Sequence, residues 1–182
     1  MSVVWAVLLV ALQRLWELWL SRRHEAILRA RGAVEYGAGD YPLFVLLHAG
    51  WLLGLLLAVP WDRPGEPTLL LAYLALQPLR LWCIHSLGTR WTTRVLVLPG
   101  VPPVARGPYR WLRHPNYLVV TLELALLPLA FGAIALALLV SLANALLLRR
   151  RIRVEDRALA EALSLAPSGG ASATPRRALR DR

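Results

Sequence analysis

The segment 107–117 contains the residue types that most suggest binding chemistry. It reads Gly-Pro-Tyr-Arg-Trp-Leu-Arg-His-Pro-Asn-Tyr and runs directly into an apolar stretch. Pro115 suits the first turn of a helix, where its missing N–H costs nothing. The free N–H groups at that helix start would lie beside Arg110, Arg113 and His114, which favours an anionic group. The alternative is a basic interfacial loop anchored by its aromatic residues, and charge and composition alone do not separate the two.

Ionisable residues also lie inside apolar stretches. Placing such a side chain in a membrane costs free energy, so it usually faces a cavity or a partner. Arg80 could hold an anionic substrate group, or its long side chain could snorkel toward the interface. Glu123 could pair with Arg80 or with Arg14. Arg14 and Glu17 are three residues apart on one helical face, which predicts a structural pair. We expect His48 to be a packed histidine rather than a ligand.

The elements that must position these residues are long apolar helices. Of the 182 residues, 57% are hydrophobic, and charge is nearly absent from the blocks 2–20, 43–59, 68–87 and 118–148. About 20 apolar residues cross the hydrocarbon core of a bilayer as a helix. The composition therefore predicts an all-α integral membrane protein and excludes an ordinary soluble domain.

The arginines predict the topology. They follow the first, third and last blocks, and positively charged loops favour the cytoplasm. This places the N-terminus outside and the C-terminus inside if the last block, which has Pro128 and Gly132 near its middle, is a hairpin of two helices of about 15 residues. We therefore predict about five transmembrane helices, with an interfacial helix starting the segment 22–40. Residues 1–166 form one domain, and 167–182 form a disordered basic tail.

Other classes of site are disfavoured. The net charge is +10 and every basic residue is arginine, but these arginines flank the apolar blocks, so we expect no nucleic-acid partner. The single cysteine, Cys83, has no partner for a disulfide and is predicted to be a small buried hydrophobe. No His, Asp or Glu spacing suggests a metal site.

The joint pattern of motifs resembles the isoprenylcysteine carboxyl methyltransferase family. Arg-His-Pro-Asn-Tyr at the start of a late helix follows Gly-Pro-Tyr-Arg, and an arginine with two adjacent acids follows the helical hairpin. The segments around 13–17, 79–82, 87–88 and 90–95 are similar to bacterial members, so the resemblance covers most of 11–165. The residues of the acidic motif are Arg153, Glu155, Asp156 and Leu159.

The resemblance implies a cytosolic pocket for S-adenosylmethionine, formed by the loop before the fourth helix and by the C-terminal segment. His114, Pro115 and Tyr117 match the family box that contacts the cofactor, and Glu155 and Asp156 match its acidic pair, with Asp in place of the more usual second Glu. Acids could hold the cationic groups of the cofactor and arginines its carboxylate. The alternative for the acidic pair is a solvated helix end. The predicted cofactor-binding residues are Arg113, His114, Pro115, Asn116, Tyr117, Glu155 and Asp156, and the predicted catalytic residues are Arg80, Arg110 and Glu123.

We therefore predict a multi-pass methyltransferase of the bacterial inner membrane that methylates an oxygen, a carboxylate or acidic hydroxyl, of a lipid-like or prenylated substrate. An ordinary alcohol or amine would need a base, and His85 or Glu123 would be the embedded candidates. The alternatives are an NADPH-dependent membrane reductase of the sterol or steroid type and a non-catalytic scaffold that binds a partner or anionic lipid. Apart from its substrate, the expected partners are membrane lipids.

Overall fold

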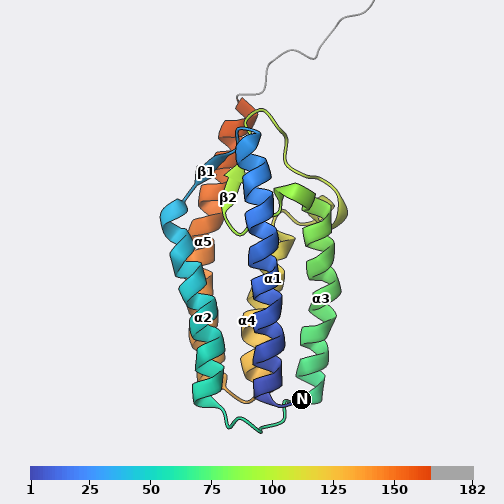
Figure 1. The fold of residues 1–182 in the computed structure, drawn as a ribbon, viewed down its shortest axis with the longest axis vertical. Helices are drawn as coiled ribbons and strands as arrows, with labels where there is room; N and C mark the ends of the chain where they lie inside the picture. The colour runs from blue at the N-terminus through green and yellow to red at the C-terminus, as the bar shows by residue number, and fades with distance from the viewer. Residues whose placement is uncertain (165–182) are drawn as a thin grey trace, which may run out of the picture.

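The computed structural model describes residues 1–164, which form a bundle of five α-helices with a small sheet at one end (Figure 1). The predicted tail, 167–182, lies outside the described residues. The helices are α1 (Val3–Ala30), α2 (Tyr41–Ala58), α3 (Pro67–Leu87), α4 (Pro115–Ala130) and α5 (Ile134–Ser164).

Three helical segments are long and apolar enough to cross a membrane, as the block pattern predicts. They are Val3–Ala30, Ala38–Ala58 and Pro67–Arg90, while the apolar helix α4 is shorter. Large apolar side chains such as Leu46, Leu57 and Leu138 are exposed on the outside of the bundle. Such a surface suits lipid rather than water.

Helix α1 is longer than its apolar block. It continues without a break through the basic residues to Ala30, so the separate interfacial helix predicted from Arg22 is wrong. The reason is local: no glycine or proline interrupts this stretch before Gly32, whose φ of 84° ends the helix.

The last block turns where Pro128 and Gly132 predict a turn. The amide N–H of Gly132, at φ 73°, donates to the carbonyl of Leu129, and α5 then runs back along the bundle. α4 has 16 residues, close to the predicted length of about 15, whereas the predicted length of the second arm is wrong, because α5 continues to Ser164 as one helix of 31 residues. The polar segment after residue 148 is therefore a rigid extension of the second arm.

The sequence pattern did not predict the two short strands. β1 (Val34–Tyr36) pairs antiparallel with β2 (Val95–Val97), and Glu35 opposite Leu96 accepts hydrogen bonds from Arg29 and Arg94. Three residues are too few to show a strand periodicity, and the pair is stabilised by packing on α5, where Ala158 and Ala162 are buried against Val95 and Val97.

Helices α2 and α5 pack antiparallel. Near the sheet, Arg150 Nε lies 2.9 Å from Asp40 Oδ2. Toward the opposite end, Leu136 packs so closely on Gly54 that a Cβ there would lie 2.8 Å from its Cδ1. The sheet end thus gathers the arginine-rich segments that follow α3 and the apolar parts of α1 and α5 (Figure 1).

The loop before α4 is docked on α3 through Gly107, at the start of the 3₁₀ turn Gly107–Arg110. This residue has φ +57°, and an added Cβ would lie 2.0 Å from Oγ of Ser86. Only glycine fits such a close approach. Cys83, one turn before Ser86 on α3, is fully buried as predicted.

Candidate active site

The box at the start of α4 and the acidic pair of α5 lie side by side. His114 Nε2 is 3.1 Å from Asp156 Oδ1, and the hydroxyl of Tyr117 donates a short hydrogen bond to Glu155 Oε2. The rings of His114 and Tyr117 stack with their centroids 5.3 Å apart. Two motifs about 40 positions apart in the chain therefore form one polar surface.

A cavity of about 130 Å³ lies against this surface. His114, Tyr117 and Glu155 line it from one side, and β2 with the residues before it lines the other. Trp91 and Asn116 also line it, and the indole N–H of Trp91 and Oδ1 of Asn116 are buried without a hydrogen-bond partner among residues 1–164. Burial raises the pKa of the Tyr109 hydroxyl in the same wall, so that hydroxyl stays protonated. Unpartnered buried donors and acceptors are what a polar ligand would satisfy.

A larger cavity of about 360 Å³ lies deeper between α1, α2, α4 and α5. Its lining is mostly apolar, with side chains such as Leu15, Phe44, Leu52 and Val120. A mainly apolar cavity among membrane helices suits the tail of an amphipathic molecule.

The two cavities share one wall. Five residues line both of them, and they are Trp91, Thr92, Asn116, Tyr117 and Arg151. Arg151 is the cation of this wall: Nε donates to the Tyr117 hydroxyl over 2.8 Å, and NH2 donates to the Thr93 carbonyl over 2.8 Å. Among the described residues no carboxylate lies within 4 Å of its guanidinium.

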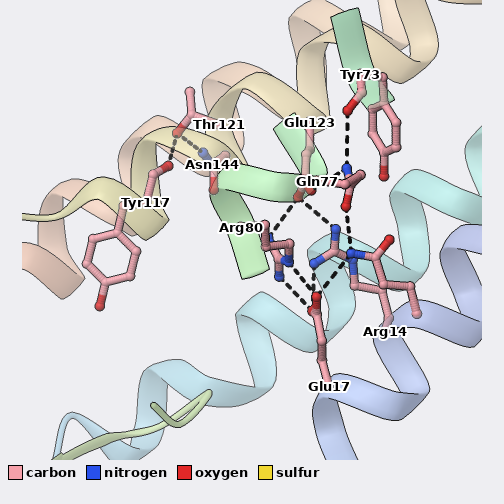
Figure 2. A network of polar contacts seen from close by, with 10 residues as sticks. Arg14, Glu17, Tyr73, Gln77, Arg80, Tyr117, Thr121, Glu123 and Asn144 are labelled. Carbon is pink, nitrogen blue, oxygen red and sulfur yellow. Dashed lines mark hydrogen bonds and ion pairs between the residues drawn. The ribbon is translucent and has the colours of Figure 1, made fainter. Parts of the chain in front are cut away.

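Four charged side chains form a closed ring beside the larger cavity (Figure 2). Arg14 lies 2.7 Å from both Glu17 and Glu123, and Arg80 lies 2.8 Å from Glu123 and forms a short ion pair with Glu17. Each guanidinium therefore touches both carboxylates, and the four charges sum to zero. The predicted Arg14–Glu17 pair is confirmed, and Glu123 pairs with both of the arginines considered for it.

Two glutamines complete this charge quartet, the ring of Arg14, Glu17, Arg80 and Glu123. Gln77 donates to Glu123 over 3.0 Å, and Gln13 donates to Glu17 and to Gln77. The side chains of Arg80 and Glu123 are 5% and 1% exposed, so Arg80 does not snorkel. The catalytic roles predicted for these two residues stay predictions. Their charges are paired with each other and with Arg14 and Glu17 of α1.

The remaining predicted residues do not line either cavity. Pro115 is buried at the first position of α4, as predicted. Arg113 is 67% exposed and lies 3.0 Å from Asp156. Arg110 is exposed beside the Trp111 ring, and neither arginine lines either cavity. His85 is likewise exposed and lines neither.

Arg151 and Asn144 line the larger cavity but were not among the predicted site residues. His48, which was expected to be a packed histidine, lines the same cavity. A signal for Arg151 was present, because it lies four residues before Glu155 and therefore on the same face of a helix. Asn144, seven residues before Arg151, continues that face. By contrast Arg153, the arginine of the resemblance, is exposed and donates to the carbonyl of Arg149 in its own helix.

Comparisons with known proteins identify the family. Residues 68–161, which include the box, the acidic pair and both walls of the polar cavity, match the isoprenylcysteine carboxyl methyltransferase (ICMT) family. The chain belongs to this family. Its members are membrane methyltransferases, so the resemblance drawn from the motifs is confirmed.

Two relatives of the chain are uncharacterized bacterial proteins. The protein YpbQ of Bacillus subtilis is 41% identical over 160 residues, which cover 86% of this chain and 94% of YpbQ. A protein of Haemophilus influenzae is 26% identical over 109 residues, which cover 57% of this chain and 63% of that protein. No solved structure shows significant similarity to the chain. Membership therefore establishes a membrane methyltransferase and leaves its substrate to be inferred from the site.

Proposed function

We propose that this protein is an S-adenosylmethionine-dependent O-methyltransferase whose lipid-like substrate occupies the larger cavity. One observation carries the proposal: a polar cavity with a carboxylate and a mainly apolar cavity share the wall of Trp91, Thr92, Asn116, Tyr117 and Arg151. A methyl donor on one side of that wall and an acceptor on the other would meet there. Holding two reactants in contact is the main task of a catalyst for this chemistry.

The residues of the polar cavity fit the proposed cofactor. Glu155 suits a cationic group, because Tyr117 engages only its Oε2 and no described side chain bonds Oε1. The unpartnered indole N–H of Trp91 and Oδ1 of Asn116 suit the polar atoms of an amino-acid or nucleoside moiety. When bound, S-adenosylmethionine supplies a methyl group on an electrophilic sulfonium. NADPH, with its phosphates, would instead require several cations and no nearby acid.

Arg151 is suited to the acceptor side of the reaction. Its positive charge, which forms no direct ion pair with a described carboxylate, would stabilise a substrate oxygen that is negatively charged or becomes so. A carboxylate or an acidic hydroxyl satisfies this condition, and either would need little help from a base. The apolar lining of the larger cavity would hold the substrate tail and exclude water.

For the membrane arrangement we propose five spanning helices, with the sheet end in the cytosol of a bacterial inner membrane. Support comes from the arginine-rich segments gathered at that end and from its ion pairs, such as Arg150 with Asp40. A water-soluble cofactor would then reach the polar cavity from the cytosol, and the acceptor would enter from the bilayer.

Calorimetry on the detergent-purified protein tests the proposal. S-adenosylhomocysteine should bind at micromolar concentrations and NADPH should not, because the carboxylate of Glu155 lines the cavity together with its three arginines and would repel a phosphate. His114→Ala and Glu155→Gln should each weaken binding about tenfold or more. Glu161→Gln, at an exposed position two turns further along α5, is the matched control and should leave binding unchanged. Binding of NADPH alone would establish a reductase instead, and equal binding by all variants would remove the box and the acidic pair from the site.

A further inference from the structure

The arginines that line the polar cavity differ in what they contact. They are Arg90, Arg94 and Arg151. Arg94 lies within 4 Å of two carboxylates, because its Nη1 is 2.6 Å from Glu35 and its Nε is 3.5 Å from Glu25. Arg151 belongs to the wall that the polar cavity shares with the larger cavity. The charge of Arg94 is thus already paired, and that of Arg151 is placed toward the methyl acceptor.

Arg90 is a cation of the polar cavity with most of its donors free. It ends the 3₁₀ turn Gly88–Arg90, directly before Trp91 of the shared wall. Its Nη1 donates to the carbonyl of Pro102 over 2.6 Å, which is its one side-chain hydrogen bond within residues 1–164. No carboxylate in this described part of the chain lies within 4 Å of its guanidinium. Because a guanidinium has five N–H donors, most of them remain available to a ligand.

The hydrogen bond to the Pro102 carbonyl orients this guanidinium before any ligand arrives. Pro102 lies in the segment that leads from β2 to α4, and its neighbours Pro103 and Val104 line the same cavity. Two adjacent prolines restrict the backbone of this segment. The amide N–H of Gly100 also attaches it to α5, by donating to the carbonyl of Ala162 over 2.9 Å. A side chain that is already oriented loses less conformational entropy when it binds a ligand.

We propose that Arg90 binds the carboxylate of the amino-acid moiety of S-adenosylmethionine. The inference rests on the proposed function and deepens it, because it identifies a residue that determines the specificity of the polar cavity. A planar guanidinium matches a carboxylate, and charge-assisted hydrogen bonds between the two are among the stronger ones in proteins. Arg90 lines the polar cavity and not the larger one, so its charge serves the cofactor rather than the methyl acceptor.

Arg113, which was expected from the sequence to bind the cofactor, is less suited to the carboxylate. Its side chain is 67% exposed, its Nε lies 3.0 Å from Asp156, and it lines neither cavity. Glu155, by contrast, lines the polar cavity together with Arg90, and no ion pair within 4 Å joins these two described residues. A cation and an acid that do not neutralise each other suit a zwitterionic amino-acid moiety.

Calorimetry with two ligands tests the role of Arg90. The ligands are S-adenosylhomocysteine and its decarboxylated analogue, which lacks only the carboxylate. Wild-type protein in detergent should bind the first at least about tenfold more tightly, the effect of a charge-assisted hydrogen bond. Arg90→Gln should remove this preference by weakening S-adenosylhomocysteine binding without weakening binding of the analogue. Arg90→Lys, which keeps the charge without the planar group, should retain part of the preference, and the exposed control Arg153→Gln should retain all of it.

The outcomes separate this inference from the proposed function. If Arg90→Gln weakens both ligands equally, Arg90 only supports the segment around Pro102, and the inference is overturned. It is also overturned if Arg113→Gln removes the preference and Arg90→Gln does not, because the carboxylate then lies at Arg113. In both cases S-adenosylhomocysteine still binds wild-type protein, so the proposed function stands. If that ligand fails to bind wild-type protein, the proposed function fails and the role of Arg90 fails with it.

Discussion

Nε of Arg151 lies 2.8 Å from the hydroxyl of Tyr117, and this bond crosses the wall between the two cavities. The same hydroxyl donates to Glu155, so one tyrosine joins the cation of the shared wall to the acid of the polar cavity. Within this series of hydrogen bonds, Arg151 orients Tyr117, and Tyr117 orients Glu155. A substitution of Arg151 should therefore change the affinity of the polar cavity for its ligand.

Arg151→Lys should weaken S-adenosylhomocysteine binding about tenfold. Lysine keeps the charge but cannot donate to both Tyr117 and the Thr93 carbonyl, as the planar guanidinium does, and a charge-assisted hydrogen bond contributes about 1.5–3 kcal/mol. Calorimetry measures the affinity. Arg153→Lys is the matched control, since Arg153 is exposed and bonds only within its own helix. Equal affinities for the two variants would show that Arg151 does not position Tyr117.

Glu123→Gln should lower the melting temperature by roughly 5–10 °C. The variant leaves two buried arginines facing one carboxylate, and a buried charge without a partner destabilises the folded state. The exposed Glu161→Gln should have no effect. Thermal unfolding followed by tryptophan fluorescence provides the measurement.

The double variant Arg14→Gln with Glu123→Gln should be more stable than Glu123→Gln alone. Removing one charge of each sign restores neutrality and leaves the Arg80–Glu17 pair intact. If the double variant is instead less stable by the sum of both single effects, neutrality of the quartet does not govern stability.

The ion pairs of β1 should make stability depend on pH. Partial burial raises the pKa of Glu35, but hydrogen bonds from Arg29 and Arg94 outweigh it and lower the pKa below its ordinary value of 4.5. A lowered carboxyl pKa stabilises the folded state above that ordinary value, and the stabilisation is lost as the pH falls through the folded pKa. The melting temperature of wild-type protein should therefore exceed that of Glu35→Gln at pH 6. The gap between them should close toward pH 3, and a gap that is constant with pH would contradict this role.

Much of the site could be predicted because its motifs are local. The box 113–117 begins α4 at Pro115, since a proline is favoured in the first turn of a helix. The acids at 155 and 156 lie on a helix because nothing after Gly132 interrupts α5. Their contact with the box was expected only from the family resemblance, since spacing alone does not bring together segments 40 positions apart.

The partners of the buried charges needed the tertiary structure. Arg14 with Glu17 follows from a spacing of three, whereas the contacts of Glu17 with Arg80 and of Arg14 with Glu123 depend on how three helices are rotated against one another. The low helical amphipathicity of membrane segments gives little indication of that rotation, because most faces are apolar.

By itself, the sequence determined the apolar helices, the gathering of arginines at one end, the turn at Gly132 and the family. These follow from hydropathy, charge and local backbone preference, which act within a few residues. Only the tertiary structure decided that His48, Asn144 and Arg151 face one cavity and that β1 pairs with β2. Such contacts join residues far apart in the chain, and their free energy depends on helix rotation and depth, which packing of the whole bundle sets.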